Sequence, residues 1–428
     1  MSKQLIIVLI LIVVVVAGAT AWFLIRGEGG GAIPEIVPEN TQSIGFPETS
    51  GRSPLNDDII PLATAGDDTK TGNGFLSEAT LSSEDRFMLV ARGPVSGAVA
   101  VLRKKASSEE KVLSVRYMER ATGHIKETKL DQGEPTRISN TTVPKVAETI
   151  FVPSGTQMIL RVFANVFNEI ETVLASVKMP IDDGSVDSPQ RTIGTLDGVS
   201  IPEEVIDLAI SPSGDEVIVL IPSADGVRGV LQSMTGENRR EIFALPTSEW
   251  LVDWPSGSII SLNSRPLPGA NGYLYFASKG EGVPARILGN EQGLTTLVSP
   301  NGTKLFAHTN TGKSQGVFLY DIPNAKKIGF PIFTLPEKCV WSKKVSSKIY
   351  CAVSVGEFAI EDGLPNSWYR GELQFEDTFW EINTETQTTI YLGSPKETAD
   401  AISPFLDPDE NYLFYTNKRD GSLWTLSL

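Results

Sequence analysis

The two cysteines of this 428-residue chain lie close together, in the stretch KCVWSKKVSSKIYCAVS. Cys339 and Cys351 are equally far from Val345, the centre of the polar turn KKVSS between two apolar runs. In an antiparallel hairpin, residues equidistant from the turn stand directly opposite, with Cα atoms about 4.5–5.5 Å apart, and that distance suits a disulfide. We therefore expect a cross-strand disulfide between them. Two buried free thiols that pack as small hydrophobic groups are the alternative.

Other side chains with distinctive chemistry are few. The chain has two histidines, His124 in a polar turn and His308 in an apolar run, so a serine triad or a Cys/His metal cluster lacks partners. Carboxylates are abundant, but no spacing singles out a pair, so a two-acid glycosidase stays open. The sequence predicts no catalytic residue, no metal site and no cofactor.

The elements that position these residues follow a repeat: a small residue or proline, a tight polar turn, then an apolar strand. Copies lie roughly 40 to 70 residues apart, the range of propeller blades. They begin at Ser82, Val152, Ser211, Trp254, Ser299, Trp341 and Leu406. In most copies an apolar residue stands five positions after the proline, namely Met158, Val217, Ile260, Leu305 and Leu413. This pattern predicts a hairpin turn that leads into a strand buried on both faces.

A second phrase follows several copies, in which two alternating strands flank a turn rich in Thr, Asn, Gly or Pro. It begins at Val115, Gly229, Gly316 and Thr378. Two hairpins per repeat predict a four-stranded antiparallel sheet, and sheets that are apolar on both faces bury them by stacking around an axis.

The segments ISPSGDEVIVL, VSPNGTKLFAH and LDPDENYLFYTNKRDGSLWTLSL resemble the WD40-like and TolB-like propeller repeats. The resemblance covers roughly Asp58–Leu428 and implies an all-β, approximately seven-bladed β-propeller; six or eight blades stay possible. The last strand of the chain, in GSLWTLSL, needs an outer partner, and Asp58–Ala65 is the predicted closing strand. Such repeats serve scaffolds, receptors and enzymes alike, so the resemblance implies little about function.

The most informative departure from the repeat is Ala359–Asp377, AIEDGLPNSWYRGELQFED, between the second and third strands of the sixth blade. Trp368, Tyr369 and Arg370 stand together at its centre, and these residue types are enriched in binding hot spots. We hypothesise a partner-binding loop there. The alternative is a loop that folds back over the blade and buries Trp368.

The N-terminus begins with residues 1–4, a short tail, followed by the uncharged apolar stretch Leu5–Ile25. Its length is sufficient to cross the roughly 30 Å of a bilayer's hydrocarbon core. A cleaved signal peptide ending near Ala19-Thr20-Ala21 is the alternative. Residues 26–57, rich in Gly, Pro and small polar residues, have the composition of a flexible tether, and residues 58–428 form the predicted propeller.

The formal charge of −15 argues against nucleic acid as a partner. We expect a single-pass membrane protein with a cytoplasmic N-terminus and an extracytoplasmic propeller, at the cell surface or in a periplasm. The expected function is a non-catalytic binding or scaffold module for a protein or surface polymer. The alternative is an exported, carboxylate-based glycan hydrolase that uses the central pocket of the propeller.

Overall fold

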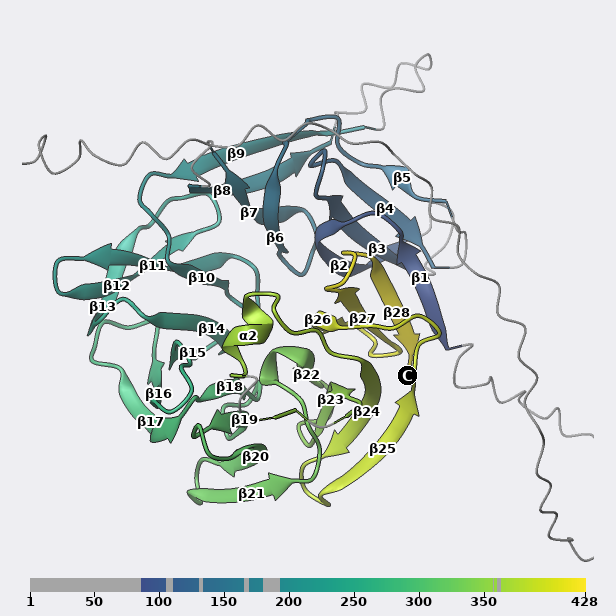
Figure 1. Cartoon of the computed structure of the whole chain (residues 1–428). Coiled ribbons are helices and arrows are strands. Elements are labelled where there is room, and N and C mark those ends of the chain that lie inside the picture. The colour runs from purple at the N-terminus through teal and green to yellow at the C-terminus, as the bar shows by residue number, and fades with distance from the viewer. Residues whose placement is uncertain are drawn as a thin grey trace, which may run out of the picture. The chain divides into compact units, whose positions relative to one another are not determined.

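Seven four-stranded antiparallel sheets are arranged around a central axis in the computed structural model of this chain (Figure 1). They belong to a compact unit, Ser77–Leu428. The all-β, seven-bladed propeller predicted from the repeat is confirmed, and rings of six or eight blades are excluded. The structure describes residues 86–104, 111–130, 134–164, 169–179, 193–356, 358–359 and 363–428.

In blades 1 to 6 the strands follow the chain outward from the axis. Blade 1 contains β2 (Val95–Lys104), β3 (Lys111–Glu119), β4 (Ile125–Lys129) and β5 (Thr136–Arg137). Blade 2 contains β6 (Val146–Phe151), β7 (Gln157–Phe163), β8 (Ile170–Lys178) and β9 (Thr195–Ile201). Blade 3 contains β10 (Asp207–Ile210), β11 (Glu216–Ser223), β12 (Gly226–Ser233) and β13 (Arg240–Pro246).

The next three blades repeat this order. Blade 4 contains β14 (Trp250–Ser256), β15 (Ile259–Ser264), β16 (Asn271–Ala277) and β17 (Ala285–Gln292). Blade 5 contains β18 (Thr295–Val298), β19 (Lys304–Asn310), β20 (Gln315–Asp321) and β21 (Lys326–Phe330). Blade 6 contains β22 (Cys339–Trp341), β23 (Lys348–Ser354), β24 (Asp377–Asn383) and β25 (Thr388–Gly393).

Blade 7 is completed by the N-terminal strand of the described chain. From the axis outward it contains β26 (Ala401–Leu406), β27 (Tyr412–Asn417), β28 (Leu423–Ser427) and β1 (Phe87–Ala91). Closure by a strand from the other terminus was predicted, but the segment was wrong. The copy starting at Ser82, assigned to a blade of its own, supplies this strand, while Asp58–Ala65 lies outside the described residues.

The repeated turn joins the first strand of a blade to the second, and its backbone conformation recurs in several blades. In blades 2, 3 and 5 the N–H of Gly155, Gly214 and Gly302 donates to the carbonyl three residues earlier, at 2.8 Å in each case. All three glycines have positive φ, which is why glycine recurs there. The predicted apolar residues of the following strands, such as Val217 and Leu305, are fully buried.

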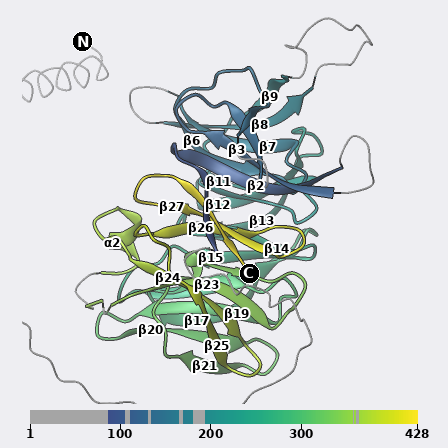
Figure 2. The ribbon, with the colours of Figure 1, turned by 90° about the vertical axis from the view of Figure 1, so that its right-hand side faces the viewer.

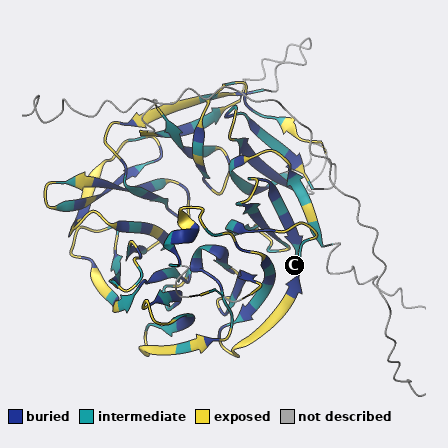
Figure 3. Cartoon of the chain, viewed as in Figure 1, coloured by how far each residue is buried: buried dark blue, intermediate teal, exposed yellow. Residues whose placement is uncertain are grey.

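Hydrophobic side chains fill the interface between each pair of neighbouring blades. Seven clusters occupy the seven interfaces of the described ring. Figure 3 shows that exposed residues concentrate on the outermost strands, such as β25, while the strands between are mostly buried. Each sheet is therefore covered on both faces by its neighbours.

The predicted tail, membrane span and tether at residues 1–57 lie outside the described residues. None of the helices within the described residues has the length and hydrophobicity that a membrane-spanning helix requires.

Candidate functional site

A cavity of about 1510 Å³ lies beside the axis of the ring. Its walls are formed mainly by the inner strands β2, β6 and β26, so it lies against blades 1, 2 and 7. Blade 6 contributes Val340 and Trp341 of β22, and blade 4 contributes Asp253. These strands reach the axis because each begins a blade.

Basic side chains lie at one end of this cavity. Arg120 follows β3, and Lys418 and Arg419 follow β27, so all three lie on connections between second and third strands. In a propeller these connections share one face. Arg120 donates from Nη2 to the carbonyl of Ala147 at 2.9 Å, and Arg419 donates from Nη2 to that of Phe375 at 2.9 Å. Each guanidinium therefore spends one donor on the fold and retains others for a ligand.

The insertion of blade 6 covers the axis on that same face. It contains a short helix, α2 (Asn366–Tyr369), which lies near the centre of the ring in Figure 1 and at one face of the disc in Figure 2. Leu335, Leu364, Trp368 and Phe375 form a separate buried cluster beneath it. The insertion is thus packed onto the propeller by its own hydrophobic core.

The three residues predicted to bind a partner have different surroundings. Trp368 is 4% exposed and stacks on Phe375, with ring centroids 5.7 Å apart, as the alternative of a folded-back loop expected. Tyr369 is 40% exposed, and its hydroxyl donates to Glu337. Arg370 is exposed and pairs with Glu372, so Tyr369 and Arg370 are accessible while Trp368 is not.

A buried ionic cluster fixes the insertion to the blades below it. The ammonium of Lys338, at the end of the 3₁₀ helix η2 (Pro336–Lys338), lies 2.7 Å from Asp400 Oδ1 and 2.7 Å from Asp377 Oδ2. It also donates to the carbonyl of Ala401 at 3.0 Å. Trp368 Nε1 donates to both oxygens of Asp400 at 3.0 Å. All three charged side chains are fully buried.

The two carboxylates of this cluster differ in their partners. Asp400 Oδ2 accepts from Trp368 Nε1 and from the N–H of Phe375, at 3.0 and 3.1 Å. Asp377 Oδ2 accepts from the N–H of Ala401 at 2.6 Å, but its Oδ1 has no partner among the described residues. Burial raises the pKa of Asp377 to about 6 even though the Lys338 ammonium lowers it.

No pattern in the sequence indicates this cluster. Lys338 and Asp400 come from two separate connections and Asp377 is the first residue of β24, and each resembles an ordinary charged residue when read alone. The inserted loop did stand out from the repeat in the sequence, and its Trp368 is in contact with this cluster. The burial of Trp368 is explained by the Asp400 carboxylate that its indole N–H meets.

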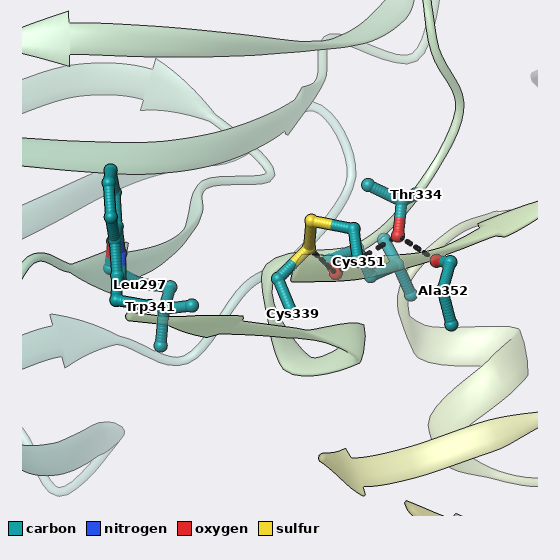
Figure 4. The surroundings of a disulfide bond; sticks show 7 residues. Leu297, Thr334, Cys339, Trp341, Cys351 and Ala352 are labelled. Carbon is teal, nitrogen blue, oxygen red and sulfur yellow. Dashed lines mark hydrogen bonds between the residues drawn. A yellow bond between two sulfur atoms is a disulfide. The ribbon is translucent and has the colours of Figure 1, made fainter. Parts of the chain in front are cut away.

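The predicted disulfide is present, and it joins the first two strands of blade 6. Cys339 and Cys351 are register partners with Cα atoms 4.1 Å apart. Figure 4 shows the bond between β22 and β23, with Trp341 Nε1 donating to the carbonyl of Leu297 in blade 5 at 3.2 Å and Thr334 Oγ1 to that of Ala352 at 2.6 Å. The bridge therefore lies in a hairpin that is also anchored to the neighbouring blade.

The two histidines lie in different blades and do not form a joint site. His124 contacts Thr142 and Arg137 in the outer part of blade 1. His308 is fully buried in blade 5, and burial lowers its pKa to about 4. The carboxylates that line the cavity are better placed for chemistry, because Glu148 and Asp253 lie on the walls of one space. Asp253 is exposed to that space, and partial desolvation by the surrounding protein raises its pKa.

Comparison with known proteins adds little to these observations. No family model matches the chain, and no curated protein matches it. One similar solved structure is the crystal structure of TolB from Acinetobacter baumannii, which is 12% identical over 72% of this chain and 63% of that chain, with a TM-score of 0.40. This chain thus spans less than two thirds of the length of that structure. The propeller fold is established by the seven sheets themselves.

Proposed function

We propose that this chain is a binding module whose axial cavity receives part of a protein or surface-polymer partner. The cavity of about 1510 Å³ carries the proposal, because it exceeds the roughly 300–1,000 Å³ of an ordinary small-molecule pocket. Arg120 and Arg419 at its mouth keep donors for carboxylate groups, so an acidic group on the partner is the chemistry that fits the mouth. Tyr369 and Arg370 on the covering insertion extend the same face.

The proposal places the propeller outside the cytoplasm, held at a membrane by Leu5–Ile25. The length and apolarity of that stretch support this placement. The disulfide of blade 6 supports it as well, because such bonds persist in oxidising compartments.

Crosslinking of the full chain in native membranes tests the binding role. An Arg120→Ala/Arg419→Ala variant should lose most of the crosslinked partner, because it removes both guanidinium groups from the mouth and leaves only the ammonium of Lys418 there. An Arg228→Ala variant, which removes an exposed arginine of β12 in blade 3, is the matched control and should keep it. A Tyr369→Ala/Arg370→Ala variant asks whether the insertion contributes. Capture that ignores both the mouth and the insertion would overturn the proposal.

The alternative function, a glycan hydrolase, draws on a different observation. Glu148 and Asp253 line one cavity, and the raised pKa of Asp253 is the property that a general acid requires. Hydrolysis of surface glycans by the full chain, abolished by Asp253→Asn, would favour it.

A further inference from the structure

Lys338 is held in the arrangement that amide formation between side chains needs. Its Nζ lies 2.7 Å from an oxygen of Asp400 and 2.7 Å from an oxygen of Asp377. The rings of Trp368 and Phe375 cover it, with centroids 5.0 and 4.8 Å from Nζ. A nitrogen in contact with a carboxylate oxygen needs only a small shift to reach the near-attack range of about 3–3.5 Å from the carbon.

The surroundings disfavour the charged forms of these groups. Three fully buried charges, one positive and two negative, leave a net negative charge in the interior, and removing each ion from water costs several kcal/mol. Proton transfer from the ammonium to a carboxylate produces a neutral amine and a neutral acid, which is the pair that can condense. The aromatic rings exclude the water that would reverse the reaction.

We propose that Lys338 and Asp400 are the site of an intramolecular isopeptide bond, with Asp377 as the group that carries the proton. Asp400 is assigned as the acceptor because Trp368 Nε1 and the Phe375 N–H both donate to its Oδ2. These two donors polarise the carboxyl group and stabilise the charge that develops on that oxygen during attack. Asp377 has no comparable pair of donors on one oxygen.

The reaction balances without any co-reactant. Asp377 Oδ2 takes a proton from the Lys338 ammonium and passes it to Oδ1 of Asp400, which leaves a neutral amine beside a neutral carboxyl group. The lone pair on Nζ then attacks Cγ of Asp400, and Asp377 takes a second proton from Nζ. The bond from Cγ to Oδ1 breaks, and Oδ1 leaves as water with these two protons, both of which came from the original ammonium. One ammonium and one carboxylate become one amide and one water. Asp377 ends in its starting state, and its raised pKa of about 6 suits a group that both takes and returns a proton.

The bond would join two connections that support the insertion. Lys338 is the last residue of the connection from blade 5 to blade 6, and Asp400 is the last residue of the connection from blade 6 to blade 7. The two residues are 62 positions apart. A covalent link there would pin the entry strands β22 and β26 together under α2, on the face that carries the basic mouth of the cavity.

Mass spectrometry of the purified full chain tests the proposal directly. We expect the digest to contain a branched peptide in which Lys338 and Asp400 are joined, lighter than its two parts by one water, in most molecules. Peptide mapping makes the result independent of any N-terminal processing. Separate, unmodified peptides containing Lys338 and Asp400 would overturn the proposal, as would a water loss that fragmentation assigns to other residues.

Variants separate the roles of the three residues. Lys338→Met and Asp400→Ala should abolish the branched peptide, and Asp377→Ala should abolish or strongly reduce it while nucleophile and acceptor remain. Lys418→Met is the matched control, because Lys418 also lies over the Trp368 ring, at 4.1 Å, but donates to a backbone carbonyl there. It should keep the bond. If a variant fails to fold, the wild-type digest still decides the question.

Discussion

At the scale of single residues, two buried ionisable groups act on stability in opposite directions. Burial raises the pKa of Asp207 to about 6, against the Val252 N–H that donates to its carboxylate at 2.7 Å. The folded chain therefore binds this proton more tightly than the unfolded chain, and the free energy of unfolding falls as pH rises from about 4 to about 6. His308, with its pKa lowered to about 4, has the reverse effect, because acidification favours the unfolded chain that binds its proton.

Replacing Asp207 with asparagine should make the protein more sensitive to acid. Asp207→Asn removes the contribution that grows on acidification and leaves that of His308 unopposed, so the free energy of unfolding should fall further between pH 6.5 and 4.5 than in the wild type. The extra fall should be on the order of 2 kcal/mol. Urea midpoints at the two pH values measure it, and the same substitution at exposed Asp225 controls for the loss of one carboxylate. Identical pH profiles for wild type and variant would contradict the assignment.

At the scale of elements, the hairpin of β22 and β23 depends on its disulfide, because β22 is only three residues long and forms few hydrogen bonds with β23. Replacing both cysteines with serine should lower the free energy of unfolding by about 2–4 kcal/mol. Urea unfolding measures the loss, and alkylation of the native, unreduced wild type checks the bridge. Two alkyl groups added to that wild-type protein would show that the thiols are free.

The elements themselves were largely predictable, and the reasons are local. The repeat can be recognised without any distant contact, because it consists of a turn with a proline, a polar residue and a glycine, followed by an apolar strand. The register of Cys339 and Cys351 followed from symmetry about the turn. The Lys338 cluster could not be predicted, since it forms only when two connections and the start of β24 meet at blades 6 and 7. The hot-spot composition of the insertion was ambiguous for the same reason, because only the position of Asp400 decides that Trp368 turns inward.

At the scale of the whole ring, closure was the feature that the repeat pattern obscured. β1 matches the repeat well enough to suggest a blade of its own, yet it pairs with β28, from Phe87 opposite Leu426 to Ala91 opposite Leu423. Arg86 adds hydrogen bonds to the carbonyls of Ser427 and Leu392, at 2.8 and 3.0 Å. The described N-terminal strand therefore links blade 7 and the edge of blade 6. It completes the ring that contains the cavity.

We propose that this ring binds its partner through the cavity beside its axis. A photoreactive amino acid at Glu148, on the cavity wall, tests this most directly when compared with one at Ile390, which is 55% exposed on the outer strand of blade 6. Irradiation of native membranes should give a discrete crosslinked partner from position 148 and none from position 390. The product should disappear in the Arg120→Ala/Arg419→Ala background. A partner captured from position 390 and none from position 148 would show that the cavity is not the binding site.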